Sequence, residues 1–186
     1  ETPHERNHIL AATLDVVRSY KNQPFWIMEQ QSGITGWEIM GRAPAPGQLS
    51  LWALQSIAHG ADAVVFFRWR TCAMGTEQYW HGILPHSGNP GRRYEELQDF
   101  IHEVNPLMER LHGSMPQAQV GIVFSFEQQY AFQIQPHHKD LSYTGQVQKY
   151  YRALYEQNIP VDFVPEQGDF TRYKLLLAPL QYLMSP

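Results

Sequence analysis

Hydrophobic and polar positions over the first 112 residues alternate between helix-like and strand-like segments. Apolar residues recur at helical spacing over residues 2–20, and a continuous apolar run follows at 25–28. The same order repeats with a helical segment at 48–59, an apolar run at 63–67 and a long amphipathic segment at 92–111. Helices that alternate with fully apolar strands are typical of an α/β fold with a parallel sheet.

The loops after the two apolar runs favour a segment of a (β/α) barrel over an open, doubly wound sheet. Both loops are long, and they hold most of the reactive side chains of this half of the chain. Barrels of this kind carry their active sites on the loops at the carboxyl ends of their strands. Because two strands cannot close a barrel, we expect most of it to lie upstream of Glu1.

A second pattern begins after a predicted linker at 112–116. It consists of a strand, a helix and two further strands, at 119–124, 143–158, 161–164 and 174–179. This order resembles a flavodoxin-like or amidotransferase-like α/β domain. The second half contains no cysteine and no glycine-rich dinucleotide motif, so an amidotransferase thiol and a bound dinucleotide are not expected. The predicted domains are therefore a barrel segment at 1–112 and an α/β domain at 117–186.

Composition and charge exclude several classes of protein. Of the 186 residues 43% are hydrophobic and 17% are charged, which is enough apolar material for a core. The net charge is -4 with both signs mixed along the chain, so no basic surface for nucleic acid is expected. The longest apolar runs are too short to span a membrane. The one cysteine, Cys72, is interpreted as a small, half-buried residue rather than a catalytic thiol.

Glu29 is the strongest candidate for chemistry, because it directly follows the apolar run at 25–28. A carboxylate at the carboxyl end of a barrel strand points toward the active-site mouth. Retaining glycosidases use two carboxyl groups about 5–5.5 Å apart, of which one attacks the anomeric carbon. The alternative is that Glu29 ends the strand as a solvated charge. An aromatic content of 13% favours carbohydrate, because aromatic rings stack on sugars.

The loop after the second strand brings together further candidate side chains. Glu77 and His81 supply an acceptor and a donor for sugar hydroxyl groups, with Trp80 between them. Arg68 and Arg70 alternate with Trp69, which suits a clamp on a carboxylate, although an exposed ion pair is the simpler alternative. The spacing of these groups fits no standard zinc motif, so neither a metal nor another cofactor is predicted.

Several blocks together resemble glycoside hydrolase family 42, whose members are β-galactosidases. The matching blocks lie at 25–30, Trp37, 46–52, 58–62, 67–70, Glu77 and 81–82 in the first half, and at 142–143, 150–155 and 158–162 in the second. The resemblance therefore covers nearly the whole chain. It implies that the chain holds strands seven and eight of a (β/α)8 TIM barrel, followed by part of a trimerisation domain.

The resemblance also implies a function and the residues that perform it. Glu29 stands at the position of the family's nucleophile in a retaining mechanism. Four residues stand where the family contacts galactose, namely Trp37, Phe67, Glu77 and His81. Glu77 and His81 are separated by three residues, whereas the common family form has two, so Trp80 is a candidate for part of this role. The family's acid/base lies in an Asn-Glu pair, and this chain contains no such pair.

The expected partners are a galactoside, the remainder of the same barrel and further copies of the chain in a trimer, and the expected location is the cytoplasm. Because the acid/base is missing, we expect the 186 residues alone to be inactive or nearly so. The alternative is a catalytically inert oligomerisation module or a galactose-binding module.

Overall fold

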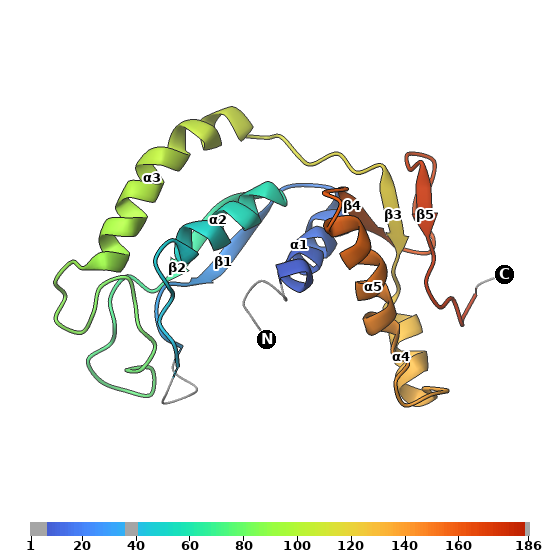
Figure 1. Ribbon diagram of the computed structural model, residues 1–186, viewed down its shortest axis with the longest axis horizontal. Helices are drawn as coiled ribbons and strands as arrows, with labels where there is room; N and C mark the ends of the chain where they lie inside the picture. The colour runs from blue at the N-terminus through green and yellow to red at the C-terminus, as the bar shows by residue number, and fades with distance from the viewer. Residues whose placement is uncertain (1–6, 36–40, 185–186) are drawn as a thin grey trace. The chain divides into compact units, whose positions relative to one another are not determined.

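The computed structural model describes residues 7–35 and 41–184 (Figure 1). The chain divides into two compact units, one formed by residues 24–114 and the other by residues 1–23 together with 115–186. Each unit is described by itself below. Both have helices packed on parallel strands, which confirms the predicted α/β class.

The unit at 24–114 is a β-α-β segment followed by a long helix. Its elements are β1 (Phe25–Gln31), α2 (Gln48–Ala58), β2 (Ala61–Phe67) and α3 (Arg92–Leu111). Strands β1 and β2 pair in parallel, α2 packs against both strands, and α3 packs on α2. Leu49 and Ala53 of α2 meet Leu97, Phe100 and Val104 of α3 in a buried cluster. Burial of these apolar side chains is the main force that holds the helices to the sheet.

The predicted elements of this unit are confirmed, with one difference at β1. The apolar run at 25–28 predicts a strand buried on both faces, but Trp26 and Met28 are 63% and 66% exposed. Among the described residues α2 covers only one face of the two-stranded sheet, and burial of the other face stays a prediction for the complete barrel. The strand also continues two residues beyond Glu29. Within 7–35 and 41–184, the helices are all too short or too polar to cross a lipid bilayer.

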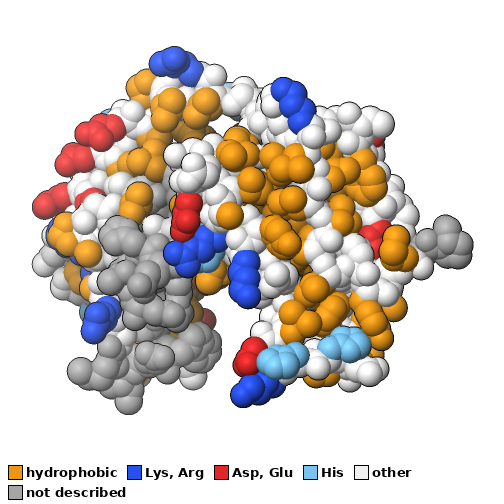
Figure 2. Space-filling view, turned by 45° about the vertical axis from the view of Figure 1, so that its right-hand side comes forward, with side chains coloured by type: hydrophobic (Ala, Val, Ile, Leu, Met, Phe, Trp, Pro, Cys, Tyr) orange, Lys and Arg blue, Asp and Glu red, His pale blue; other side chains and the backbone are white. Residues whose placement is uncertain are grey.

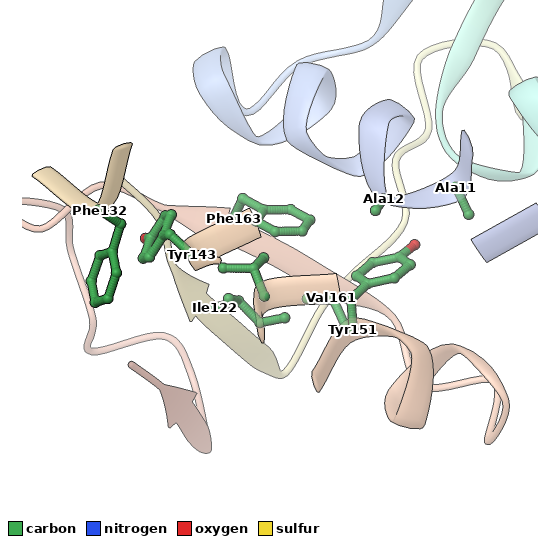
Figure 3. Close-up of a cluster of buried hydrophobic side chains, with 9 residues drawn as sticks. Ala11, Ala12, Ile122, Phe132, Tyr143, Tyr151, Val161 and Phe163 are labelled. Atoms are coloured by element: carbon green, nitrogen blue, oxygen red, sulfur yellow. The ribbon is translucent and has the colours of Figure 1, made fainter. Parts of the chain in front are cut away.

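The second unit is a three-stranded parallel sheet with helices packed on it. Its elements are α1 (Asn7–Lys21), β3 (Val120–Val123), α4 (Phe126–Ile134), α5 (Tyr143–Tyr155), β4 (Val161–Val164) and β5 (Leu175–Leu177). The strand order is β4-β3-β5, so the first strand of the domain is central. Figure 3 shows the core, in which Phe163 and Ile122 of the sheet lie with Tyr143 and Tyr151 of α5 and Ala12 of α1.

Helix α4 is absent from the sequence-based prediction. Ser125 precedes it and accepts a hydrogen bond from the backbone N–H of Gln128 through its side chain. A serine followed three residues later by Gln or Glu is a capping-box pattern, so this signal was present in the sequence.

Helix α1 packs against the C-terminal sheet. It contacts β4 and α5, and Asp15 and Arg18 on its inner face are 4% and 1% exposed. The sequence-based division grouped this helix with residues 1–112, whereas its packing joins it to residues 115–186. The division into domains at 1–112 and 117–186 stays a prediction.

Candidate active site

Glu29 lies in an irregular part of β1. Ile27 pairs with Val64 and Gln30 pairs with Phe66, so Met28 and Glu29 together oppose the single residue Val65. Two residues of one strand opposite one residue of the other define a β-bulge. Bulges are common beside active sites, where they change the direction of a side chain.

The bulge changes which face of the sheet Glu29 occupies. Trp26 and Met28 are exposed and Ile27 is partly buried, as strict alternation requires. Continued alternation would turn Glu29 to the covered side, but Glu29 is exposed and Gln30 is partly buried. The extra residue therefore places the carboxylate on the same open face as Trp26.

The carboxyl ends of β1 and β2 are joined through Ser32. Its hydroxyl group lies 2.7 Å from the carbonyl oxygen of Phe67, and 3.3 Å from those of Arg68 and His81. The backbone N–H of His81 donates to the carbonyl oxygen of Ile34 at 3.0 Å. These bonds hold the turn after Glu29 against the loop that follows β2.

The loop after β2 returns to its own start through backbone hydrogen bonds. Ile83 donates to the carbonyl of Arg68 at 2.7 Å, and Leu84 donates to that of Trp69 at 2.8 Å. Buried Thr71 donates to the carbonyl of Leu84 and accepts from the N–H of Gly82. The intervening residues, with Glu77 and Trp80, therefore form a loop with a fixed base.

Arg68 organises the charged part of this loop. Its guanidinium group donates to the carboxylate of Glu77 and to Sγ of Cys72. The same group lies over the ring of Phe67, 4.5 Å from its centre. Glu77 is exposed, so its carboxylate is held by Arg68 while it still faces solvent. Such a carboxylate can accept hydrogen bonds from sugar hydroxyl groups.

Aromatic rings flank this carboxylate. The rings of Phe67 and Trp80 meet edge to face with their centres 6.4 Å apart. The rings of His81 and His86 are also perpendicular, with centres 5.4 Å apart. Burial lowers the pKa of His81, and the nearby charges of His86 and Arg93 lower it further. His81 is therefore neutral at pH 7, and its ring can both donate and accept a hydrogen bond.

Of the six residues predicted for the site, four lie together around this loop: Phe67, Glu77, Trp80 and His81. Glu29 lies on the adjacent strand, and Trp37 lies outside the described residues. The predicted clamp of two arginines was wrong, because Arg70 donates to the carbonyl oxygen of His86 at 2.9 Å while only Arg68 meets a carboxylate. Among residues 7–35 and 41–184, no three His, Cys, Asp or Glu side chains are grouped as a metal site would require.

The sequence reasoning missed the residues that support the site from behind. Ser32, Thr71 and Gly82 are buried, and none of them has a side chain that suggests catalysis. A Cβ atom on Gly82 would lie 2.6 Å from the carbonyl oxygen of Arg68, so only glycine fits there. The Ser32-Gly33 pair directly after the strand was the one visible sign of a tight turn.

Comparison with known proteins gives consistent matches along the chain. A family model described as β-galactosidase matches residues 1–107, and a model described as β-galactosidase trimerisation domain matches residues 118–186. The β-galactosidase BgaA of Clostridium cellulovorans is 38% identical over 183 residues, which are 98% of this chain and 28% of that protein.

Solved structures show the same similarity. The β-galactosidase from Bacillus circulans sp. alkalophilus matches with a TM-score of 0.90 and 32% identity, over 100% of this chain and 28% of that one. A polyextremophilic β-galactosidase from the Antarctic haloarchaeon Halorubrum lacusprofundi matches with a TM-score of 0.86 and 35% identity, over 96% of this chain and 26% of that one. The chain thus spans less than a third of the length of these relatives.

Proposed function

Because the chain belongs to glycoside hydrolase family 42 and carries part of its TIM barrel with its trimerisation domain, we propose that it works as part of a β-galactosidase. The substrate is a terminal β-D-galactoside. One observation carries this proposal most strongly: the exposed carboxylate of Glu29 lies in a bulge beside the strand that leads to Glu77, Trp80 and His81. A nucleophile beside a fixed loop of carboxylate, imidazole and indole groups is suited to a sugar.

The proposed reaction is a double displacement with retention of configuration. The carboxylate of Glu29 attacks the anomeric carbon, and the bond from that carbon to the leaving oxygen breaks while an acid protonates the oxygen. Water then attacks the same carbon, releases galactose and regenerates the carboxylate, with its proton passing to the same acid/base. We assign no residue of this chain to the acid/base. In the proposal it comes from the remainder of the barrel.

The loop residues bind the sugar in this proposal. Glu77, held by Arg68, accepts hydrogen bonds from hydroxyl groups, and neutral His81 donates or accepts one. Phe67 and Trp80 provide apolar surface for the C–H faces of the ring. Trp37 completes the set by its position in the sequence.

Covalent trapping tests the role of Glu29. We expect a fluorinated galactosyl inactivator to label Glu29 in the full-length protein, as mass spectrometry of a digest would show. Glu29→Gln is expected to abolish hydrolysis of a nitrophenyl galactoside without loss of folding. Glu103→Gln, a change of an exposed glutamate on α3, serves as the matched control. A label on another side chain, or an active Glu29→Gln variant, would overturn the proposal.

The C-terminal unit has surface suited to association with further copies. It exposes several large hydrophobic side chains, among them Tyr130, Ile134, Tyr182 and Met184. Hydrophobic side chains gather on the right-hand part of the face in Figure 2. Exposed apolar patches of this kind are typical of interfaces. We propose a trimer, and a monomer in light scattering of the full-length protein would contradict it.

A second candidate function is galactose binding without hydrolysis, which the same loop would allow. Calorimetry with galactose together with the hydrolysis assay separates the two, because a pure binder gives heat but no product. A cytoplasmic location remains a prediction from the family resemblance.

A further inference from the structure

We propose that Ser32 is a positioning residue for the candidate active site. In this inference its hydroxyl group fixes the distance between the strand that carries Glu29 and the residues that bind the sugar. The inference rests on the proposed function, since it concerns how that site is held in place. Ser32 lies outside the blocks at 25–30 and 81–82 that carry the resemblance of Glu29 and His81 to the family.

The position of Ser32 makes it a junction of three segments. It follows β1 directly and lies three residues after Glu29. Its hydroxyl group faces the carbonyl oxygens of Phe67, Arg68 and His81, at 2.7, 3.3 and 3.3 Å. Phe67 ends β2, and His81 belongs to the returning part of the loop. One side chain therefore contacts the nucleophile's strand, the neighbouring strand and the sugar-binding loop.

Burial of Ser32 makes its hydrogen bond difficult to replace. Ser32 is 1% exposed, so water cannot easily replace its hydroxyl group as a donor. A hydroxyl group has one hydrogen to donate, and the shortest distance assigns it to Phe67. The carbonyl of Arg68 already accepts from the N–H of Ile83 at 2.7 Å. Loss of the Ser32 hydroxyl group would leave the carbonyl group of Phe67 without this donor.

Gly33, the residue after Ser32, leaves little space for the turn to move away from His81. A Cβ atom on Gly33 would lie 2.4 Å from the carbonyl oxygen of His81 and 2.7 Å from its Cβ atom. The turn therefore packs directly on the backbone of His81. The side chain of Gln31 closes the same turn with a bond of 2.7 Å to the carbonyl of Gly33. The buried hydroxyl group of Ser32 lies against the same backbone, 3.3 Å from the carbonyl oxygen of His81.

The predicted consequence is a change in substrate binding more than in the chemical step. Ser32 donates to the carbonyl of Phe67 and lies 3.3 Å from that of His81, and both of these residues bind the sugar in the proposal; it does not bond to the carboxylate of Glu29. In the full-length protein, Ser32→Ala is expected to raise KM for a nitrophenyl galactoside about tenfold, with a smaller change in kcat. Ser32→Cys keeps the shape of the side chain with a slightly larger atom and a weaker donor, so we expect an intermediate KM.

Ser56→Ala is the matched control. Ser56 is also buried, at 3% exposure, and its hydroxyl group donates to the carbonyl of Trp52 within α2 at 3.1 Å. We expect a KM within about twofold of the wild-type value. If Ser32→Ala does not yield folded protein, Gly33→Ala tests the same junction, because its methyl group pushes against His81 and is also expected to raise KM.

Two results would overturn the inference while the proposed function stands. One is a wild-type KM in Ser32→Ala, or in Gly33→Ala where that variant replaces it, together with an inactive Glu29→Gln protein. The other is an equal rise of KM in Ser56→Ala, which would indicate a general loss of stability. A fully active Glu29→Gln protein would instead contradict the proposed function itself.

Discussion

Arg18 of α1 donates from Nη1 to Oδ1 of Asp162 in β4 at a distance of 2.6 Å, and both side chains are buried. Its Nη2 atom donates to Asp15 at 2.9 Å and to the carbonyl of Val161 at 2.8 Å. Tyr151 donates to the second oxygen of Asp15 at 2.5 Å. The network links three elements that lie far apart in the sequence, and it raises the pKa of Arg18, because the two carboxylates outweigh the effect of burial.

Replacement of Arg18 by methionine is expected to destabilise the C-terminal unit strongly. The change removes the cation that Asp15 and Asp162 share, and removal of one partner from a buried ion pair costs about 3–5 kcal/mol. Asp162 keeps its ion pair with Arg172 at 2.6 Å, so we expect a cost at the lower end of this range. Urea unfolding followed by circular dichroism would measure the change in the free energy of unfolding. Arg152→Met is the control, because Arg152 and Glu156 form an exposed pair on α5, and such pairs contribute about 0.5 kcal/mol. Equal losses in both variants would contradict the role of burial.

Arg68→Ala is expected to weaken substrate binding. The variant removes the partner that holds the carboxylate of Glu77 and the cation above the ring of Phe67. We expect KM to rise about tenfold in the full-length protein, as loss of one charged hydrogen bond would predict. Arg70→Ala should have a smaller effect, because Arg70 donates only to the carbonyl of His86. Steady-state kinetics of both variants make the comparison, and a larger effect at Arg70 would contradict it.

His81 gives the site a predictable response to acid. Its pKa in the folded protein is lowered by burial and by the charges of His86 and Arg93. The unfolded chain therefore binds a proton at this position more readily than the folded chain does. The contribution of His81 to stability is complete above the ordinary histidine pKa of about 6.5 and is lost as the pH falls below it. Thermal melts of the wild type and His81→Gln between pH 7 and pH 5 should show a smaller loss in the variant, and parallel losses would exclude the effect.

Gly82→Ala is expected to disrupt the base of the loop. A methyl group there would meet the backbone of Arg68 and Arg70 at distances of 2.6 and 2.8 Å, and a backbone cannot move as easily as a side chain. We expect a loss of about 1–3 kcal/mol in the free energy of unfolding, as for other overpacked sites. At Gly91 a methyl group would meet nothing within 4 Å, so Gly91→Ala should cost less. Differential scanning calorimetry of the two variants would decide between these outcomes.

Hydrophobic periodicity predicted the order of elements well. The amphipathic segment at 92–111 became α3 with the same bounds, and the apolar runs became β1, β2, β3, β4 and β5 with small shifts at their ends. The packing of α1 could not be predicted in this way. Its apolar face could pack on any sheet. Its packing on β4 depends on the ion pair between Arg18 and Asp162, which lies 144 residues away in the sequence.

The candidate site could be predicted where a residue type itself suggests chemistry. Glu29 directly follows the apolar run at 25–28, and Glu77 and His81 lie in the loop after β2, so the sequence pattern was enough to name them as candidates. Ser32 and Gly82 act through their fit to the backbone of other segments, which depends on distances that no local pattern contains. The ion pair of Arg68 and the different role of Arg70 likewise depend on how the loop returns.

The extra residue in β1 determines which face of the sheet carries the carboxylate of Glu29. Side chains change sides with every residue, so a strand that kept Met28 but paired without the bulge would send the carboxylate of Glu29 to the side covered by α2. Loss of Met28 together with the bulge would instead leave the carboxylate at an alternating position on the open side, with Trp26. A related sequence with the same residues from Trp26 to Glu29 in a regularly paired strand would therefore carry the motif without the proposed chemistry.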